Sequence, residues 1–141
     1  MKRFTLAAIS LIAFTMFASE NPPKVAPEDQ PQYNASGELQ LPKNYRDWVF
    51  LSSGLGMDYS KTERDMAGVK PEDEPTFDTV FVSPSAYRAF LQTGAWPDKT
   101  MFALEVRSGE SHVSINHSGF TQGKLFSIAS AVKDESRFKE K

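Results

Sequence analysis

Cysteine is missing from all 141 residues of this sequence, and its absence excludes several chemistries. These residues can form no disulfide bridge, no thiolate nucleophile, no zinc–thiolate site and no cysteine-linked lipid anchor. An excess of basic residues is also missing, because the formal net charge is −2. The chain therefore lacks the positive field that nucleic-acid binding needs, and it has no glycine-rich phosphate loop.

A hydrophobic run long enough to span a membrane is missing as well, but a shorter run stands at the N-terminus. Residues 1–3 are Met-Lys-Arg, residues 4–17 are mostly apolar, and small residues follow at positions 18 and 19. The apolar run of roughly 12 to 14 residues is shorter than the ~20 of a transmembrane helix. The pattern predicts a signal peptide over residues 1–19 and a periplasmic or secreted mature protein without a membrane segment. An uncleaved anchor and a buried N-terminal strand are the alternatives.

The domain boundary is predicted from composition. Residues 20–36 are rich in proline, asparagine, glutamine and glutamate and show no apolar periodicity, which predicts a flexible linker. The folded unit is then predicted over residues 37–141, as one domain with a single core. The acidic run at residues 72–74 is interpreted as solvated carboxylates, with metal ligation as the alternative.

Five segments of the chain alternate in the way that is typical of β-strands. Short turns between the last of them favour antiparallel pairing. We therefore predict an α+β fold, in which one principal helix packs on a mainly antiparallel sheet. The predicted strands cover residues 48–52, 76–82, 100–107, 111–117 and 124–132.

The single predicted helix covers residues 84–93. Ser83 stands before it and supplies a hydroxyl N-cap. Gly94 stands after it and can adopt the left-handed conformation that ends a helix. The apolar stripe of this helix includes Phe90 and Leu91, and both side chains are predicted to be buried.

Few side chains offer chemistry. His112 and His117 are five positions apart, so on one strand they would lie on opposite faces and could not share a metal ion. Either could bind a metal singly, although exposure alone is the more common state of such a histidine. Glu105 is a candidate catalytic carboxylate in an aromatic-rich stretch, or it forms a weak surface ion pair with Arg107. The residues alone thus predict an exported domain with an aromatic interior and indicate no particular reaction.

Three stretches of the sequence resemble the cytochrome P-460 family, which includes the cytochromes c′-beta. Residues 37–51 (GELQLPKNYRDWVFL) contain the leucine-proline, tyrosine-arginine and tryptophan entry typical of the family. Residues 79–107 resemble its strand, helix and following strand. Residues 119–138 resemble its glycine-rich turn, sheet strand and valine-lysine-aspartate segment ending in arginine-phenylalanine. These stretches follow one another in the order that the family has.

The resemblance implies a periplasmic, mainly antiparallel β domain that encloses a c-type haem and commonly forms a homodimer. Members of the family oxidise hydroxylamine or bind nitric oxide and related gases, so the implied partner is hydroxylamine or a small nitrogen-oxide ligand. The resemblance further implies that Phe102, Leu104 and Val106 form the wall that faces the haem.

Two departures from the family pattern limit what the resemblance implies. The family attaches its haem through a C-terminal Cys-x-x-Cys-His motif, and this sequence has no cysteine and is expected to end before that place. The P-460 proteins also carry a lysine cross-linked to the haem, and Leu104 stands at that position here. We therefore expect haem c as the cofactor of the family, but no covalent haem in these residues.

Three interpretations of function follow. The first is the N-terminal and central part of a P-460-like haem protein of hydroxylamine or nitric oxide chemistry. The second is a haem-free exported module with a binding or structural role. The third is an enzyme that acts through Glu105 or His112.

Overall fold

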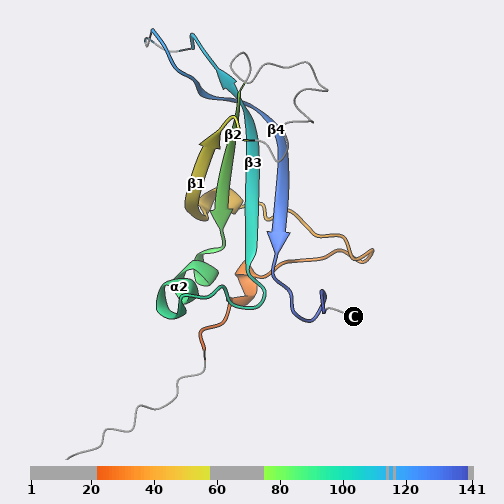
Figure 1. The fold of residues 1–141 in the computed structure, drawn as a ribbon. Helices are drawn as coiled ribbons and strands as arrows, with labels where there is room; N and C mark the ends of the chain where they lie inside the picture. Colours follow the sequence, from red (N-terminus) through yellow and green to blue (C-terminus); the bar gives the residue numbers. More distant parts are fainter. Residues whose placement is uncertain (1–21, 58–74, 114, 116, 140–141) are drawn as a thin grey trace, which may run out of the picture.

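One four-stranded antiparallel sheet forms the domain, with strand order β1-β2-β3-β4 (Figure 1). The computed structural model describes residues 22–57, 75–113, 115 and 117–139, so the predicted signal peptide and the acidic run lie outside the described residues. α2 is the single α-helix among the described residues, which confirms the predicted α+β class. The elements are η1 (Pro27–Asp29), η2 (Tyr45–Asp47), β1 (Val49–Leu55), β2 (Thr76–Val82), α2 (Pro84–Thr93), β3 (Met101–Glu110) and β4 (Thr121–Val132).

Four of the five predicted strands are confirmed, and β1, β3 and β4 extend beyond their predicted limits. The predicted strand at 111–117 is wrong for its described residues. β3 and β4 stay paired as far as Glu110 and Thr121, so the residues between them form the connection of a hairpin. His112 has φ 62°, in the left-handed region, which extended backbone does not adopt. This hairpin projects from the end of the sheet opposite to α2 (Figure 1).

The limits predicted for α2 are confirmed, and Gly94 ends the helix with φ 72°. Ser83 occupies the predicted N-cap position, but the predicted role of its hydroxyl is wrong, because Ser83 Oγ makes no capping hydrogen bond and is buried without a partner among the described residues. The carboxylate of Asp29 in η1 caps the helix instead: its Oδ2 accepts the N–H of Ser85 at 2.8 Å. A carboxylate suits this place because the N-terminal end of a helix carries partial positive charge.

The buried face of α2 also differs from the prediction. The helix packs through its small residues Ala86 and Ala89, which are buried. Phe90 is half-buried and stacks on Trp96, with ring centroids 4.1 Å apart. Leu91 is 66% exposed, so its predicted burial is wrong. It follows Ala89 by two positions, which places it about 200° around the helix and toward solvent.

Residues 22–36 pack against the domain, whereas their composition predicts a flexible linker. Val25 is 3% exposed and clusters with Val82 and Ala86. The N–H of Ala26 donates to Ser85 Oγ at 2.9 Å. Val25, Ala26 and Asp29 hold this segment on residues 82–86. Composition does not reveal these contacts, because the partners are more than 50 residues away in the sequence. The described folded unit thus begins before residue 37.

The two faces of the sheet are covered differently. We call one the helix face, because α2 packs at its end around Val82. We call the other the covered face, because Tyr45 and Trp48 pack there on Met101 and Ala103. Residues paired in register share a face. The helix face accordingly carries Asp78, Val80 and Val82 on β2, Phe102, Leu104 and Val106 on β3, and Ser127, Ala129 and Ala131 on β4.

Candidate functional site

The three residues predicted to face a haem lie together on the helix face. Phe102, Leu104 and Val106 alternate along β3, and each is half-buried. Leu104 is paired with Val80 on β2 and with Ala129 on β4, so aliphatic side chains extend the wall on both sides. We call this surface the apolar wall: Val80, Phe102, Leu104, Val106, Ala129 and Ala131.

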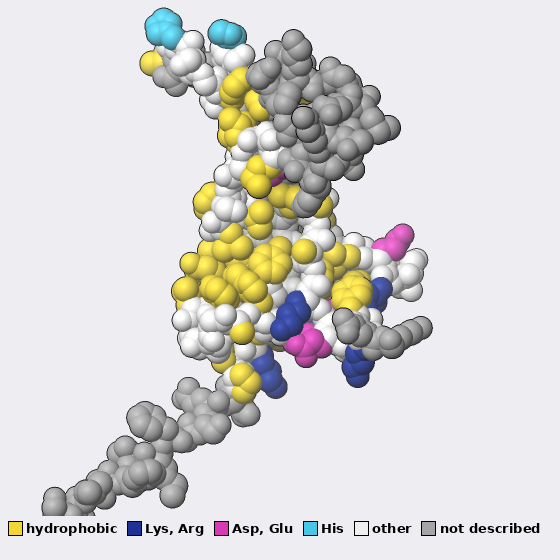
Figure 2. Space-filling view, viewed as in Figure 1, with side chains coloured by type: hydrophobic (Ala, Val, Ile, Leu, Met, Phe, Trp, Pro, Cys, Tyr) yellow, Lys and Arg dark blue, Asp and Glu magenta, His cyan; other side chains and the backbone are white. Residues whose placement is uncertain are grey.

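Aromatic side chains close the apolar wall at the α2 end. Trp96 meets Phe102 edge to face, with ring centroids 5.0 Å apart and an interplanar angle of 84°. Phe90 of α2 stacks on the same indole, with ring centroids 4.1 Å apart. Hydrophobic side chains gather over the strands beside α2 (Figure 2). The site therefore has a rigid aromatic end and a flat aliphatic floor, which suits a flat apolar ligand.

Strand β4 leaves the wall open along one side. Ser127, Ala129 and Ala131 are exposed, although they lie on the same face as the half-buried residues of β3. Their short side chains leave a flat surface on which another group can approach the backbone closely. Within the described part of the chain, no helix or strand covers this surface.

Asp78 ends the apolar wall on the side away from α2. It pairs in register with Val106 on β3 and with Gly54 on β1, so it shares the helix face. Its side chain is half-buried, and burial raises the pKa of its carboxyl above the ordinary value. Among the described residues, no hydrogen bond or ion pair satisfies this carboxylate.

Glu105 lies on the covered face, and its geometry corrects the predicted weak surface pair. The side chain is 2% exposed. Tyr45 donates its hydroxyl to Glu105 Oε2 at 2.5 Å, and Arg46 donates Nε to Oε2 at 2.9 Å and Nη2 to Oε1 at 2.7 Å. Arg107 donates its Nε to Oε1 as well. The pair with Arg107 therefore exists, but within a buried cluster of three donors.

The electrostatics of this cluster make Glu105 a poor proton carrier. Burial of the carboxyl raises its pKa, but the hydrogen bonds from Arg46, Tyr45 and Arg107 outweigh burial and lower the pKa to about 2. Burial and the hydrogen bond to Glu105 raise the pKa of Tyr45, which stays protonated. Glu105 is thus an anion at neutral pH whose oxygens are occupied, and it binds residues 45 and 46 to β3. The geometry gives no support to Glu105 as a catalytic base.

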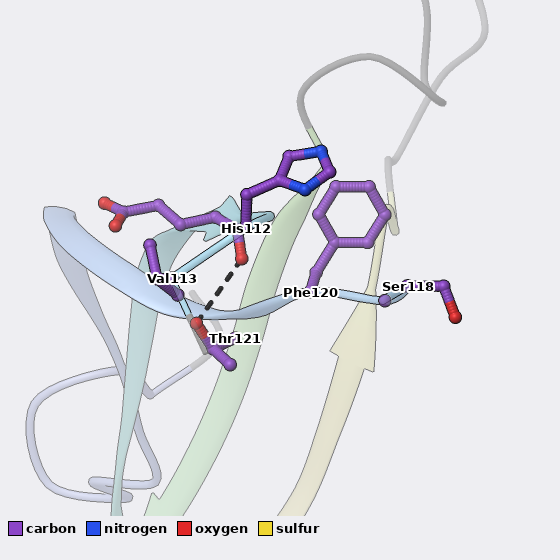
Figure 3. Close-up of a pocket in the computed structure, with 7 residues that line it drawn as sticks. His112, Val113, Ser118, Phe120 and Thr121 are labelled. Carbon is purple, nitrogen blue, oxygen red and sulfur yellow. Dashed lines mark hydrogen bonds between the residues drawn. The ribbon is translucent and has the colours of Figure 1, made fainter. Parts of the chain in front are cut away.

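The histidines lie apart from the apolar wall. Both are exposed, and the histidine side chains lie at the projecting end of the hairpin, away from the hydrophobic patch (Figure 2). A shallow hollow there is lined by Glu110, His112, Phe120 and Thr121, and His112 and Phe120 point to the same side of it (Figure 3). The described residues contain no group of three or more side chains that could hold a metal ion. His112 therefore lies in a surface hollow away from the apolar wall.

Comparison with known families gives a match that covers most of the fold. The model of the cytochrome P460 family matches residues 42–141. The chain belongs to the cytochrome P460 family. No curated protein matches it. The P460 domain so defined includes all four strands and α2, and therefore both the apolar wall and the Glu105 cluster.

The cofactor of the family can be tested against the residues of this P460 domain. The apolar wall fits one face of a porphyrin ring. The thioether bonds of a c-type haem have no counterpart, because the sequence contains no cysteine. Neither histidine reaches the wall to serve as an axial ligand. These residues thus fit the ring of the cofactor but not its attachment.

Sequence reasoning missed two features of this P460 domain. The alternation that places Val80 and Val82 on one face also places Asp78 there, so this residue could have been found from its strand position. The side chains that donate to Glu105 could not have been found from the sequence, because Tyr45 and Arg46 precede Glu105 by 60 and 59 residues. Among the described residues, no helix is long and apolar enough to cross a bilayer.

Proposed function

We propose that this chain is an exported binding domain of the cytochrome P460 family, active in the periplasm or outside the cell. It holds a flat apolar ligand of the haem class against the apolar wall, without a covalent bond from its own residues. The observation that carries this proposal is the wall itself, with Leu104 half-buried at its centre beside Val80 and Ala129. Such a surface binds a ligand through shape complementarity and burial of apolar area, and it carries no reactive side chain.

The expected affinity follows from the area that the wall can cover. Burying roughly 200 Å² of apolar surface would contribute about 5 kcal/mol. Association itself costs several kcal/mol of lost freedom, so only part of this gain remains. We therefore expect weak and reversible binding in the absence of an iron–protein bond.

A bound haem would supply the iron that binds hydroxylamine or a small nitrogen oxide, and these remain the expected small-molecule partners. The residues of this chain would orient the ring and exclude water from one of its faces. Leu104 would lie against the ring without forming a cross-link, because its side chain has no nucleophilic nitrogen. A homodimer is a further expectation, and the free side of β4 gives it a surface.

A haem-free module with a binding or structural role is the second candidate function. The absence of cysteine favours it, since a protein without thioether bonds keeps a haem only by non-covalent contacts. The two candidates differ in one measurable property, which is the affinity of the exported chain for haem.

A haem titration of the full chain, purified from an exporting host, tests the proposal. Haemin should quench the fluorescence of Trp96, which lies at the end of the wall, more than that of Trp48 on the covered face. Leu104→Glu should weaken haemin binding at least about tenfold, because it places a charge on the apolar wall. Leu91→Glu is the matched control, since this leucine is exposed on α2 and should leave binding unchanged. Equal affinity in both variants would contradict the proposal.

The absence of a covalent bond is tested in the same host, with a working cytochrome c maturation system. The purified protein is denatured and extracted with acidified solvent. Haem should leave the polypeptide completely. Porphyrin absorbance that stays with the polypeptide would show an attachment that the sequence does not explain.

A further inference from the structure

Lys133 stands out because it is a cation beside the aromatic end of the apolar wall. It follows β4 directly, and its N–H donates to the carbonyl of Thr100 at 2.9 Å, so the pairing of the two chains continues beyond β3 and β4. Its Nζ donates to the carbonyl of Trp96 at 2.9 Å. Because the ring of Trp96 meets Phe102 of the wall, the ammonium group lies where the wall ends at α2.

The open side of the wall leads to this lysine. On β4, Ala129 and Ala131 share the helix face and are exposed. Alternation along the strand places residue 133 next on that face. Ala129 and Lys133 are four residues apart, about 13 Å along an extended chain, which a porphyrin-sized ligand can span. A ligand that lies over Ala129 therefore meets only the small side chain of Ala131 before it reaches Lys133.

A cavity of about 490 Å³ opens at this end of the domain, and Lys133 contributes to its lining. The N-terminal segment around Val25 and the turn around Pro97 form other parts of the lining. Lys and Arg side chains gather beside the hydrophobic patch at the end where α2 lies (Figure 2). A cavity of this size is typical of small-molecule sites, so the apolar wall adjoins a polar space that a ligand can enter.

Lys133 can exchange its present partner for a ligand. Its ion pair with Glu135 measures 3.3 Å, and the Glu135 side chain is 66% exposed, so the pair contributes little. An ammonium group has three N–H donors, and Trp96 and Glu135 occupy two of them. Lys99, which also lines the cavity, differs because the buried carboxylate of Asp134 holds its Nζ. Lys133 is therefore the more available of these two cations.

The lining of the cavity as a whole carries little net charge. It contains three lysines, Lys24, Lys99 and Lys133, and two carboxylates, Asp98 and Glu135. Asp98 Oδ1 accepts the N–H of Glu135 at 2.8 Å. A strong positive field is thus missing, so recognition of an acidic ligand requires direct contact with one ammonium group.

We infer that Lys133 binds the acidic group of a flat ligand whose apolar body lies on the apolar wall. The ligand class is a planar ring system with a carboxylate at the end toward α2. Haem belongs to this class, because its two propionates leave the ring from one edge. The inference rests on the proposed function, since the wall must bind the ring. Lys133 then determines the orientation of the ring, with its acidic edge toward α2.

Haemin and haemin dimethyl ester test the inference on the full chain, purified from an exporting host. The two compounds have the same ring and iron and differ only in the acidic groups, so any contact with the iron cancels in the comparison. Titration in one buffer, followed by quenching of tryptophan fluorescence, measures both affinities. The parent protein should bind haemin about tenfold more tightly than the diester, as a charge-assisted hydrogen bond requires.

The variants separate Lys133 from a general effect of net charge. Lys133→Gln should weaken haemin binding about tenfold and leave diester binding unchanged, so that the preference disappears. Lys133→Arg keeps the charge and should keep the preference. Lys124→Gln is the matched control, because this exposed lysine lies on β4 near the hairpin, and both affinities should stay those of the parent.

A salt titration of the parent needs no variant, so it decides the question even if Lys133→Gln folds poorly. Raising the salt concentration from about 0.01 M to about 1 M shortens the Debye length from about 30 Å to about 3 Å. The preference for haemin over the diester should decrease accordingly, and a preference that salt leaves unchanged would contradict an ionic contact.

The possible failures have different meanings. If haemin and the diester bind the parent equally, or if the preference survives in Lys133→Gln, the role of Lys133 is overturned while the apolar wall remains a binding surface. If neither compound binds the parent, the proposed function fails and this inference fails with it.

Discussion

Glu105 and Asp78 lie on adjacent strands of one sheet, but the fold treats their carboxylates in opposite ways. Glu105 is on the covered face, where three side chains donate to it and lower its pKa to about 2. Asp78 is on the helix face, where burial raises its pKa and no described side chain pairs with it. The covered face is thus completed by residues of the chain itself, whereas the helix face carries a carboxylate that no described side chain satisfies.

Removing Glu105 should have the largest effect on stability. Glu105→Ala leaves the Tyr45 hydroxyl and Arg107 Nε without their acceptor inside the domain, although Arg107 Nη1 still donates to the carbonyl of Gly123. Breaking a buried ion pair costs about 3 to 5 kcal/mol, and we expect the lower end because the Arg46 side chain is 56% exposed and can reach water. Urea unfolding measures the loss. Glu135→Ala, at an exposed ion pair with Lys133, is the control and should change stability by less than about 0.5 kcal/mol.

Truncation of a buried apolar side chain should cost more stability on the covered face than on the helix face. Met101→Ala removes a fully buried side chain of the covered face and should cost about 2 to 4 kcal/mol of unfolding free energy. Leu104→Ala, on the half-buried helix face, should cost about half as much because fewer contacts are lost. Equal losses in chemical denaturation would show that the helix face is as closely packed as the covered face.

Acid should weaken the covered face within a defined pH window. The pKa of Glu105 falls from 4.5 to about 2 on folding, so its stabilising contribution is complete above pH 4.5 and is lost as the pH falls toward 2. The loss attributable to Glu105 should reach at most about 3 kcal/mol. The hydrogen bond from Lys99 lowers the pKa of Asp134 as well, so Asp134 adds to the decrease of stability with falling pH. The difference between the parent and Glu105→Gln in unfolding free energy, measured against pH, isolates the contribution of Glu105. If the two curves of stability against pH are parallel, Glu105 does not titrate in this window.

The helix cap should have a smaller effect. Asp29→Ala removes the acceptor of the Ser85 N–H and should lower stability by about 1 kcal/mol, as is usual for a lost N-cap. Glu28→Ala, on the neighbouring exposed residue of η1, serves as the control in thermal unfolding. If both variants unfold at the temperature of the parent, the cap is not formed in solution.

Truncation of the exposed face of α2 should have the smallest effect. Leu91→Ala should change the free energy of unfolding by about 0.5 kcal/mol or less, because the leucine is already exposed. Burial of Leu91, as the apolar stripe predicts, would instead give a loss of about 2 to 5 kcal/mol. A large loss would therefore reverse the assignment of the buried face.

The sequence allows the prediction of elements whose signals are local. The limits of β2 and α2 follow from alternation, a proline at the first helical position and Gly94, and the structure confirms them. Residues 111–117 alternate equally well, but pairing of β3 with β4 ends before them. Alternation alone cannot show where a partner strand is missing.

Contacts between distant residues could not be predicted. The cap by Asp29 joins residues 56 apart, and the donors to Glu105 lie about 60 residues before it. Leu91 belongs to the apolar stripe of α2, which predicts its burial, but the helix packs through Ala86 and Ala89 and leaves this leucine exposed. The apolar wall could be predicted only in part. Alternation along the strand predicts that Phe102, Leu104 and Val106 share one face, but it does not predict what covers that face.

The order of the strands has a consequence for how the protein folds. Each strand pairs with the strands next to it along the chain, so the sheet can form by successive local pairings, which is a fast route. The N-terminal segment must wait, because Val25 and Asp29 dock on residues that become ordered only with α2. Its contacts should therefore form after the rate-limiting step, so that Asp29→Ala speeds unfolding and leaves the folding rate unchanged in stopped-flow measurements. The segment that comes first among the described residues would then be the last to dock on the domain.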